Sequence, residues 1–132
     1  RGNVDRIEVD SDGRHYIIDF KTGKKEISGD DAKSNLQLAC YQLGVVLDGF
    51  EEKLQSTEVL GAQLVYLASK NKSYSTREQD ALVDVEATTT ILEEIAVGMG
   101  AATFIARKND MCKQCKVKPS CPLYLEGKAV HQ

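Results

Sequence analysis

Two aspartates and a lysine near the amino terminus are the residues whose types and spacing best suit chemistry. Asp5 and Asp19 each lie in an apolar-rich run, "NVDRIEV" and "HYIIDF", and Lys21 follows two positions after Asp19. A charge in a packed strand is costly unless it is paired. Paired carboxylates suit Mg²⁺ or Mn²⁺, which need only one or two of them. With an adjacent ammonium, such a site would promote attack of water on a phosphodiester. The simpler alternative is that all three are solvated residues on an exposed strand face.

A β-hairpin is the element that must bring these side chains together. Residues 3–9 and 15–20 have strand character, and the "SDG" between them supplies an Asp-Gly turn. In a hairpin centred on Asp12, Asp5 lies opposite Asp19, and their Cβ atoms are within about 5.5 Å. Lys21 then projects to the same face. A register slip of one residue would separate the pair, so the prediction depends on a three-residue loop.

The rest of the chain reads as alternating helices and strands. Apolar residues at helical spacing predict an amphipathic helix over residues 31–47, with Asp30 or Asp31 as its cap. Residues 58–69 predict a strand buried on both faces, and the polar residues 70–80 predict a loop. Residues 81–85 are a candidate short strand, residues 87–106 a second helix, and the remainder a loop. This order predicts a small mixed α/β domain.

These residues resemble the motifs of the PD-(D/E)XK nuclease superfamily, and specifically its RecB-like branch. "GNVDRIE" followed by "IIDFKTG" is similar to its second and third motifs, and "NLQLACY" matches the glutamine-x-x-x-tyrosine motif through Gln37 and Tyr41. The resemblance implies a restriction-endonuclease-like core, with a central mixed sheet flanked by helices. It implies the catalytic set Asp5, Asp19, Lys21, Gln37 and Tyr41.

The same resemblance implies a metal site and a DNA-binding face. Mg²⁺ or Mn²⁺ would be held by Asp5, Asp19 and the main-chain carbonyl of Phe20, with a further ligand from a helix that precedes the first strand. Since the sequence opens almost directly on that strand, we expect a truncated fragment of a longer protein, weakly active or inactive by itself. Lys24, Lys25, Gln37 and Tyr41 are the expected DNA contacts.

Three cysteines follow the second predicted helix. Cys112, Cys115 and Cys121 are spaced C-x2-C-x5-C, which suits zinc or an iron-sulfur cluster with a fourth ligand. Cys40 lies in the apolar stripe of the first predicted helix, so we interpret it as a core thiol. His131 could complete a zinc site. Disordered free thiols are the remaining alternative.

The cysteine tail also resembles that of the iron-sulfur nucleases of the AddB and Cas4 type. Their fourth cysteine lies upstream of the nuclease core, so the resemblance favours a 4Fe-4S cluster in the full-length parent over Zn²⁺, in a structural role. Lysines 108, 113, 116 and 118 flank the ligands and are weaker candidates for phosphate contacts than Lys24 and Lys25.

Composition bounds the remaining possibilities. With 132 residues, the chain is long enough for one compact domain. Its formal charge of −3 argues against a protein whose whole surface is basic and binds nucleic acid non-specifically. We expect residues 1–106 to form the nuclease core and residues 107–132 its cysteine-containing tail. No apolar run approaches the length that spans a bilayer and no signal peptide is recognisable, so we expect a cytoplasmic protein without a membrane partner.

The resemblance carries the functional expectation. It implies a metal-dependent exonuclease domain acting on single-stranded DNA, within an AddAB or RecBCD-type helicase-nuclease of DNA repair and recombination, with a helicase domain or subunit as partner. Asp19 stands where Cas4 proteins usually have glutamate, which favours this over a Cas4-like stand-alone nuclease. The alternative from another class is a catalytically inactive DNA-binding or scaffolding copy of the same fold.

Overall fold

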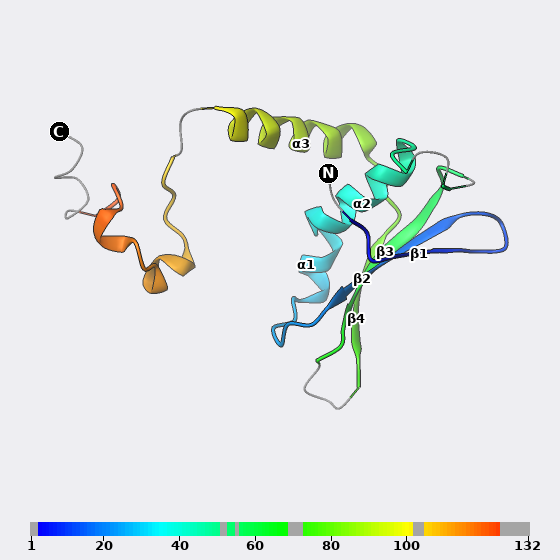
Figure 1. Cartoon of the computed structure of the whole chain (residues 1–132), viewed down its shortest axis with the longest axis horizontal. Coiled ribbons are helices and arrows are strands. Elements are labelled where there is room, and N and C mark those ends of the chain that lie inside the picture. The colour runs from blue at the N-terminus through cyan, green and yellow to red at the C-terminus, as the bar shows by residue number, and fades with distance from the viewer. Residues whose placement is uncertain (1–2, 51–52, 55, 69–72, 102–104, 125–132) are drawn as a thin grey trace. The chain divides into compact units, whose positions relative to one another are not determined.

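A computed structural model describes residues 3–50, 53–54, 56–68, 73–101 and 105–124. Two compact units are distinguished by their internal contacts, residues 1–93 and 94–132. The first contains all four strands of the described chain and two short helices (Figure 1). The elements are β1 (Arg6–Val9), β2 (His15–Lys21), α1 (Gly29–Lys33), α2 (Leu36–Val46), β3 (Val59–Tyr66), β4 (Ser75–Asp80) and α3 (Val85–Gly100).

The sheet is mixed and has the order β1-β2-β3-β4. β1 pairs antiparallel with β2, β2 parallel with β3, and β3 antiparallel with β4. The parallel pair requires a crossover, which α1 and α2 provide between β2 and β3. α2 packs on β2 and β3, and α1 contacts β4. The predicted mixed α/β architecture with flanking helices is therefore confirmed.

The core lies between α2 and one face of β2 and β3. Its buried residues are Ile17, Leu38, Val45, Ala62, Leu64 and Tyr66. Because side chains alternate along a strand, Ile17, Asp19 and Lys21 share the face that α2 covers. The strand that positions the two chemical groups is therefore anchored by the core just before them.

The hairpin register agrees with the prediction. Arg6 pairs with Ile18 and Val9 with His15, and the main-chain N–H of Asp10 donates to the carbonyl of Arg14 at 3.0 Å. Three residues remain in the loop, and the last of them, Gly13, has a φ of 82°. A left-handed third residue is typical of three-residue hairpin loops and favours glycine. The turn chemistry thus sets the register.

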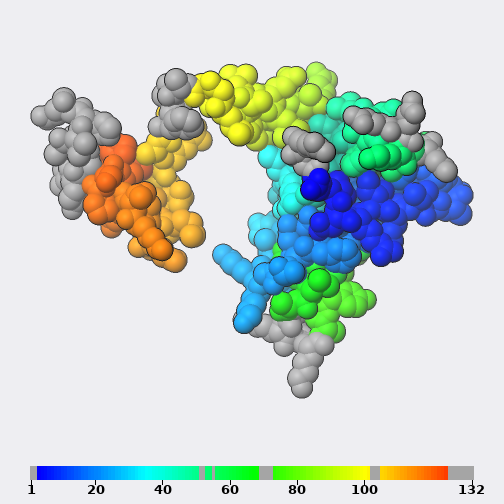
Figure 2. Space-filling view, viewed as in Figure 1, coloured from blue at the N-terminus to red at the C-terminus, as the bar shows by residue number. Residues whose placement is uncertain are grey.

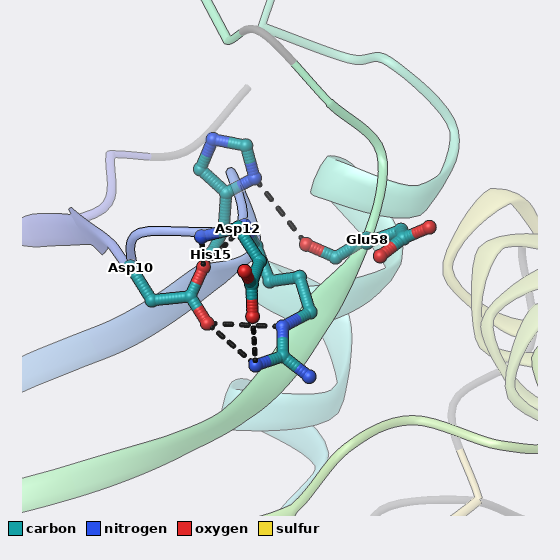
Figure 3. Close-up of polar contacts among 5 residues, drawn as sticks. Asp10, Asp12, His15 and Glu58 are labelled. Atoms are coloured by element: carbon teal, nitrogen blue, oxygen red, sulfur yellow. Dashed lines mark hydrogen bonds and ion pairs between the residues drawn. The ribbon is translucent and has the colours of Figure 1, made fainter.

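The hairpin loop also holds a small ionic cluster (Figure 3). Oδ1 of Asp10 accepts the main-chain N–H groups of Asp12 and Arg14, at 2.9 and 2.8 Å. Oδ2 accepts the Arg14 Nε–H at 2.9 Å. The main-chain hydrogen bond from Arg14, together with its guanidinium, lowers the pKa of Asp10. The carboxylate form of Asp10 is therefore the one that the folded loop prefers.

Asp10→Asn is expected to lower stability at neutral pH and to have no effect in acid. A carboxyl whose pKa is depressed by folding stabilises above its unfolded pKa of about 3.9 and loses that contribution as the pH falls through the folded value. Urea unfolding of wild type and Asp10→Asn at a series of pH values measures this. A difference in unfolding free energy that is the same at pH 7 and below the folded pKa would contradict it.

Three predicted elements need correction. The helix expected over residues 31–47 is two helices, because the side chain of Asn35 accepts the Leu38 N–H and starts α2 afresh. The N-cap of α1 is Ser28, which forms a capping box with Asp31, so neither predicted aspartate is the cap itself. Residues 70–80, expected as a loop, contain β4. Residues 81–85 were a candidate strand, but residues 81–84 are irregular and α3 begins at Val85.

Nothing in the described part of the chain is a helix long and apolar enough to cross a membrane.

Candidate active site

β2 places Asp19 and Lys21 at the edge of the core. Asp19 is 4% exposed, directly after Ile17 on the face that α2 covers. The side chain of Lys21 is 31% exposed, and its Nζ lies 2.7 Å from Oδ2 of Asp19. A buried carboxylate with a close cation satisfies the requirement that buried charge be paired. The spacing of two positions in a strand accounts for the pairing.

α2 brings the Gln37 side chain to the same place. Its Nε2 donates to Oδ1 of Asp19 at 3.1 Å and to the Tyr41 hydroxyl at 2.8 Å, and its Oε1 accepts from Lys21 Nζ at 2.7 Å. Only one orientation of the amide fits, because an ammonium can only donate and a carboxylate can only accept. Gln37 and Tyr41 meet because residues four apart share a helix face. Four of the five predicted site residues therefore form one continuous network.

One oxygen in this network is incompletely satisfied. Oδ2 of Asp19 is buried and, within the described part of the chain, accepts no hydrogen bond. Its contact with Lys21 Nζ, at 2.7 Å, is an ion pair. A buried carboxylate oxygen normally accepts at least one hydrogen bond. Oδ2 therefore keeps a lone pair that suits a further cation.

Asp5 lies just before the first residue of β1. Its Oδ2 accepts the main-chain N–H of Phe20 at 2.9 Å, so the side chain takes the place of the strand backbone. This is why β1 begins at Arg6 and not at residue 3 as predicted. Since the N–H and C=O of one strand residue point to the same side, the Phe20 carbonyl also points toward Asp5. Asp5 itself is exposed.

The three predicted metal ligands are thus neighbours in the fold. Two carboxylates and a main-chain carbonyl are the hard oxygen donors that Mg²⁺ and Mn²⁺ prefer, and water completes such sites. The unsatisfied Oδ2 of Asp19 agrees with this donor set. No group of three or more His, Cys, Asp or Glu residues that could hold a metal occurs among the residues described. A cation here would depend on the Phe20 carbonyl and water for its further ligands.

The predicted DNA-contacting lysines lie in the loop after β2. Lys24 and Lys25 are exposed, and the segment that contains them, coloured light blue, projects from the surface (Figure 2). The base of this loop is tied to β4, since Arg77 donates to the Ile27 carbonyl and the Glu26 carboxylate, both at 2.9 Å. The loop is therefore anchored at its end while its lysines face solvent.

Two buried glutamines were missed by reasoning from the sequence. Gln42 is fully buried on α2, and Gln79 is 8% exposed on β4. Gln42 follows Leu38 by four positions, so a polar residue on the core face of the predicted helix was the available signal. Gln79 gave no such signal, because it lies in the polar stretch "STREQD".

The predicted cysteine site is not formed in the described structure. Cys112, Cys115 and Cys121 lie in and around two short 3-10 helices, Asp110–Gln114 and Lys118–Ser120, and all three are free thiols. They do not come together as a set of metal ligands. Cys112 Sγ instead accepts the Asn109 N–H at 3.3 Å, and Asn109 caps the first of these helices. His131 lies outside the described residues.

The alkylation rates of the cysteines should differ. Burial raises the pKa of the Cys40 thiol, whereas Cys115 is exposed. The thiolate is the nucleophile, so a raised pKa and reduced access both slow the reaction. With iodoacetamide at pH 8, mass spectrometry of tryptic peptides should show Cys115 modified well before Cys40. Faster modification of Cys40 would contradict the placement of this residue.

Comparisons with known proteins found a family match and a distant structural match. The sequence profile of the PD-(D/E)XK nuclease superfamily matches residues 1–122. The crystal structure of SSO0001 is 18% identical, with a TM-score of 0.44 over 92% of this chain and 50% of that one. The chain therefore spans half the length of SSO0001. No curated protein matches.

Proposed function

The chain belongs to the PD-(D/E)XK nuclease superfamily, and from this premise we propose that it is a metal-dependent nuclease that hydrolyses single-stranded DNA. The observation that carries the proposal is the network that joins Asp19, Lys21, Gln37 and Tyr41, with Asp5 on the adjacent main chain. These residues come from a strand, a helix and a strand end. Gln37 contacts Asp19, Lys21 and Tyr41 through polar atoms, and Asp5 accepts the N–H of Phe20, the residue between Asp19 and Lys21. A solvated strand face would give no such convergence.

Asp5, Asp19 and the Phe20 carbonyl are the proposed metal ligands. A bound Mg²⁺ or Mn²⁺ would neutralise the phosphate and lower the pKa of the attacking water. Lys21 lies beside Asp19, where its ammonium stabilises negative charge that develops on the phosphate oxygens. Gln37 fixes the positions of Asp19 and Lys21 by bonding to both. The Tyr41 hydroxyl, bonded to the Gln37 amide, extends the polar face toward the DNA strand.

DNA binding is proposed for the exposed loop after β2. Lys24 and Lys25 are exposed cations that follow Lys21 closely in the chain. Phosphate contacts by lysine are independent of sequence and weaken with salt. The proposed exonuclease would therefore hold its strand through the backbone, without base-specific contacts.

We further propose that the domain is of the RecB-like type and works with a helicase domain or subunit in DNA repair. Asp19 and the Gln37–Tyr41 pair support this assignment, because they match that branch of the superfamily. The iron-sulfur or zinc centre stays a prediction for the cysteine tail, to be checked by measuring the iron and zinc content of the full-length parent. No catalytic role depends on it.

The proposal is tested by incubating the chain with end-labelled single-stranded and duplex DNA, with Mg²⁺, Mn²⁺ or EDTA. We expect cleavage of the single strand with either metal and none with EDTA. DNA binding without cleavage under all conditions would instead favour the scaffolding alternative. Equal cleavage in EDTA would overturn the metal-dependent mechanism.

A further inference from the structure

Gln42 and Gln79 form a buried amide pair that the proposed chemistry does not use. Gln42 Nε2 donates to Oε1 of Gln79 at 3.0 Å and to the Asp80 carbonyl at 3.1 Å, and Gln42 Oε1 accepts the Leu82 N–H at 2.9 Å. Burying an amide costs free energy unless its polar atoms are bonded. Here α2 is joined to β4 and to the residues that follow β4 through two side chains that are almost entirely buried.

The Nε2 group of the Gln79 amide contacts main-chain carbonyls at the junction between α1 and α2. Its Nε2 lies 3.0, 3.1 and 3.0 Å from the carbonyl oxygens of Ala32, Lys33 and Asn35. The last carbonyls of a helix have no partner within it, and in α1 those of Ala32 and Lys33 contact the Gln79 amide on β4. The carbonyl of Asn35 also accepts the first intrahelical bond of α2, from Ala39. Gln79 therefore holds the break between the two helices in one position.

These two ties flank the site residues on α2. Asn35 precedes Gln37 by two positions, and Gln42 directly follows Tyr41. Gln37 must satisfy Asp19, Lys21 and Tyr41 at the same time, with distances of 2.7 to 3.1 Å. A displacement of the start of α2 would break this network, because Gln37 lies in its first turn.

β4 is itself held closely against β3 at this point. Gly61 has a φ of 140°, and a Cβ there would lie 2.6 Å from the Gln79 carbonyl oxygen. Only glycine permits this approach. β4, which carries Gln79, is thus held in place against β3 and in turn fixes the position of the junction between α1 and α2.

We propose that the Gln42–Gln79 pair is a positioning device that sets α2 so that the Gln37 amide bridges Asp19 and Lys21. The effect of the pair on catalysis rests on the proposed nuclease function. Its effect on the position of the Gln37 side chain is independent of that function. Misplacement of a catalytic group by about 1 Å can cost about 10²-fold in rate. Loss of either glutamine amide should therefore lower kcat by about 10- to 100-fold, with little change in KM.

The test compares Gln79→Met and Gln42→Met, each of which removes the amide and keeps the volume, with Val45→Ala. Val45 is a fully buried residue of α2 in the apolar core, so its truncation costs packing without removing a hydrogen bond. All variants are studied at a temperature where circular dichroism shows them folded. The direct readout is the side-chain amide resonance of Gln37 in ¹⁵N–¹H spectra, which requires no activity.

We expect the Gln37 amide resonances to shift toward free glutamine in both methionine variants and to stay in place in Val45→Ala. Where wild type cleaves DNA, kcat should fall in the same two variants, and the double variant should lose no more than either one, as coupled residues do. Unchanged Gln37 resonances in a folded methionine variant would overturn the proposal, as would an equal shift in Val45→Ala. Absence of cleavage in wild type would count against the nuclease function alone.

Discussion

Replacing Asp19 by asparagine is expected to slow metal-dependent cleavage of DNA about 10²- to 10³-fold while the domain stays folded. Asparagine keeps the size of the side chain and an oxygen that can accept from Gln37, so the network loses mainly its negative charge. That charge sits on a carboxylate that is 4% exposed, with one buried oxygen not hydrogen-bonded in the described structure. Loss of one electrostatic group of this kind costs about 10²- to 10³-fold in rate. Lys21, 31% exposed, can turn to solvent, so little stability should be lost.

The rate is measured with excess single-stranded DNA and saturating Mn²⁺, and folding is checked by thermal melting. Asp10→Asn is the matched control, because it removes a carboxylate of the hairpin loop that is bonded to Arg14. We expect the control to cleave like wild type at neutral pH. Equal activity of Asp19→Asn and wild type would remove Asp19 from the mechanism.

Replacing Lys21 by methionine is expected to separate metal binding from catalysis. In the described structure the Lys21 ammonium lies 2.7 Å from the Asp19 Oδ2 atom that a metal would also bind. Without this competing cation, the carboxylate should bind Mn²⁺ more tightly. The rate should fall about 10²- to 10³-fold, since the group that stabilises developing charge is gone.

Calorimetric titration gives the Mn²⁺ affinity, and a single-turnover assay gives the rate. Lys24→Met is the control, because Lys24 is an exposed lysine of the following loop. It should weaken DNA binding and reduce its salt dependence without altering Mn²⁺ affinity. Weaker Mn²⁺ binding by Lys21→Met than by wild type would show that the lysine does not compete for Asp19.

The sequence was most informative where short-range rules apply. The "SDG" turn and the left-handed Gly13 set the hairpin register, and the register sets which face Asp19 and Lys21 share. The spacing of four between Gln37 and Tyr41 likewise places both on one helix face. These relations need no knowledge of the rest of the fold. The site roles of Gln37 and Tyr41 were expected only from the resemblance to the RecB-like motifs.

The errors lie where tertiary contacts override local pattern. β4 is polar because it is paired only with β3, and its one buried side chain, Gln79, is satisfied by carbonyls about 45 residues earlier in the chain. The break between α1 and α2 depends on that same contact. The start of β1 depends on the Asp5 carboxylate, which accepts the Phe20 main-chain N–H, a contact that no strand pattern reveals. Cysteine spacing alone did not bring the tail thiols together.

The central claim is that a divalent metal binds between Asp5, Asp19 and the Phe20 carbonyl. It is tested most directly by titrating Mn²⁺ into the ¹⁵N-labelled chain and following paramagnetic broadening of the main-chain amides. We predict that the amides of residues 5 and 19–21 broaden first, and that Asp19→Asn abolishes this selective loss. Broadening that begins elsewhere, or that is unchanged in Asp19→Asn, would contradict the proposed metal site.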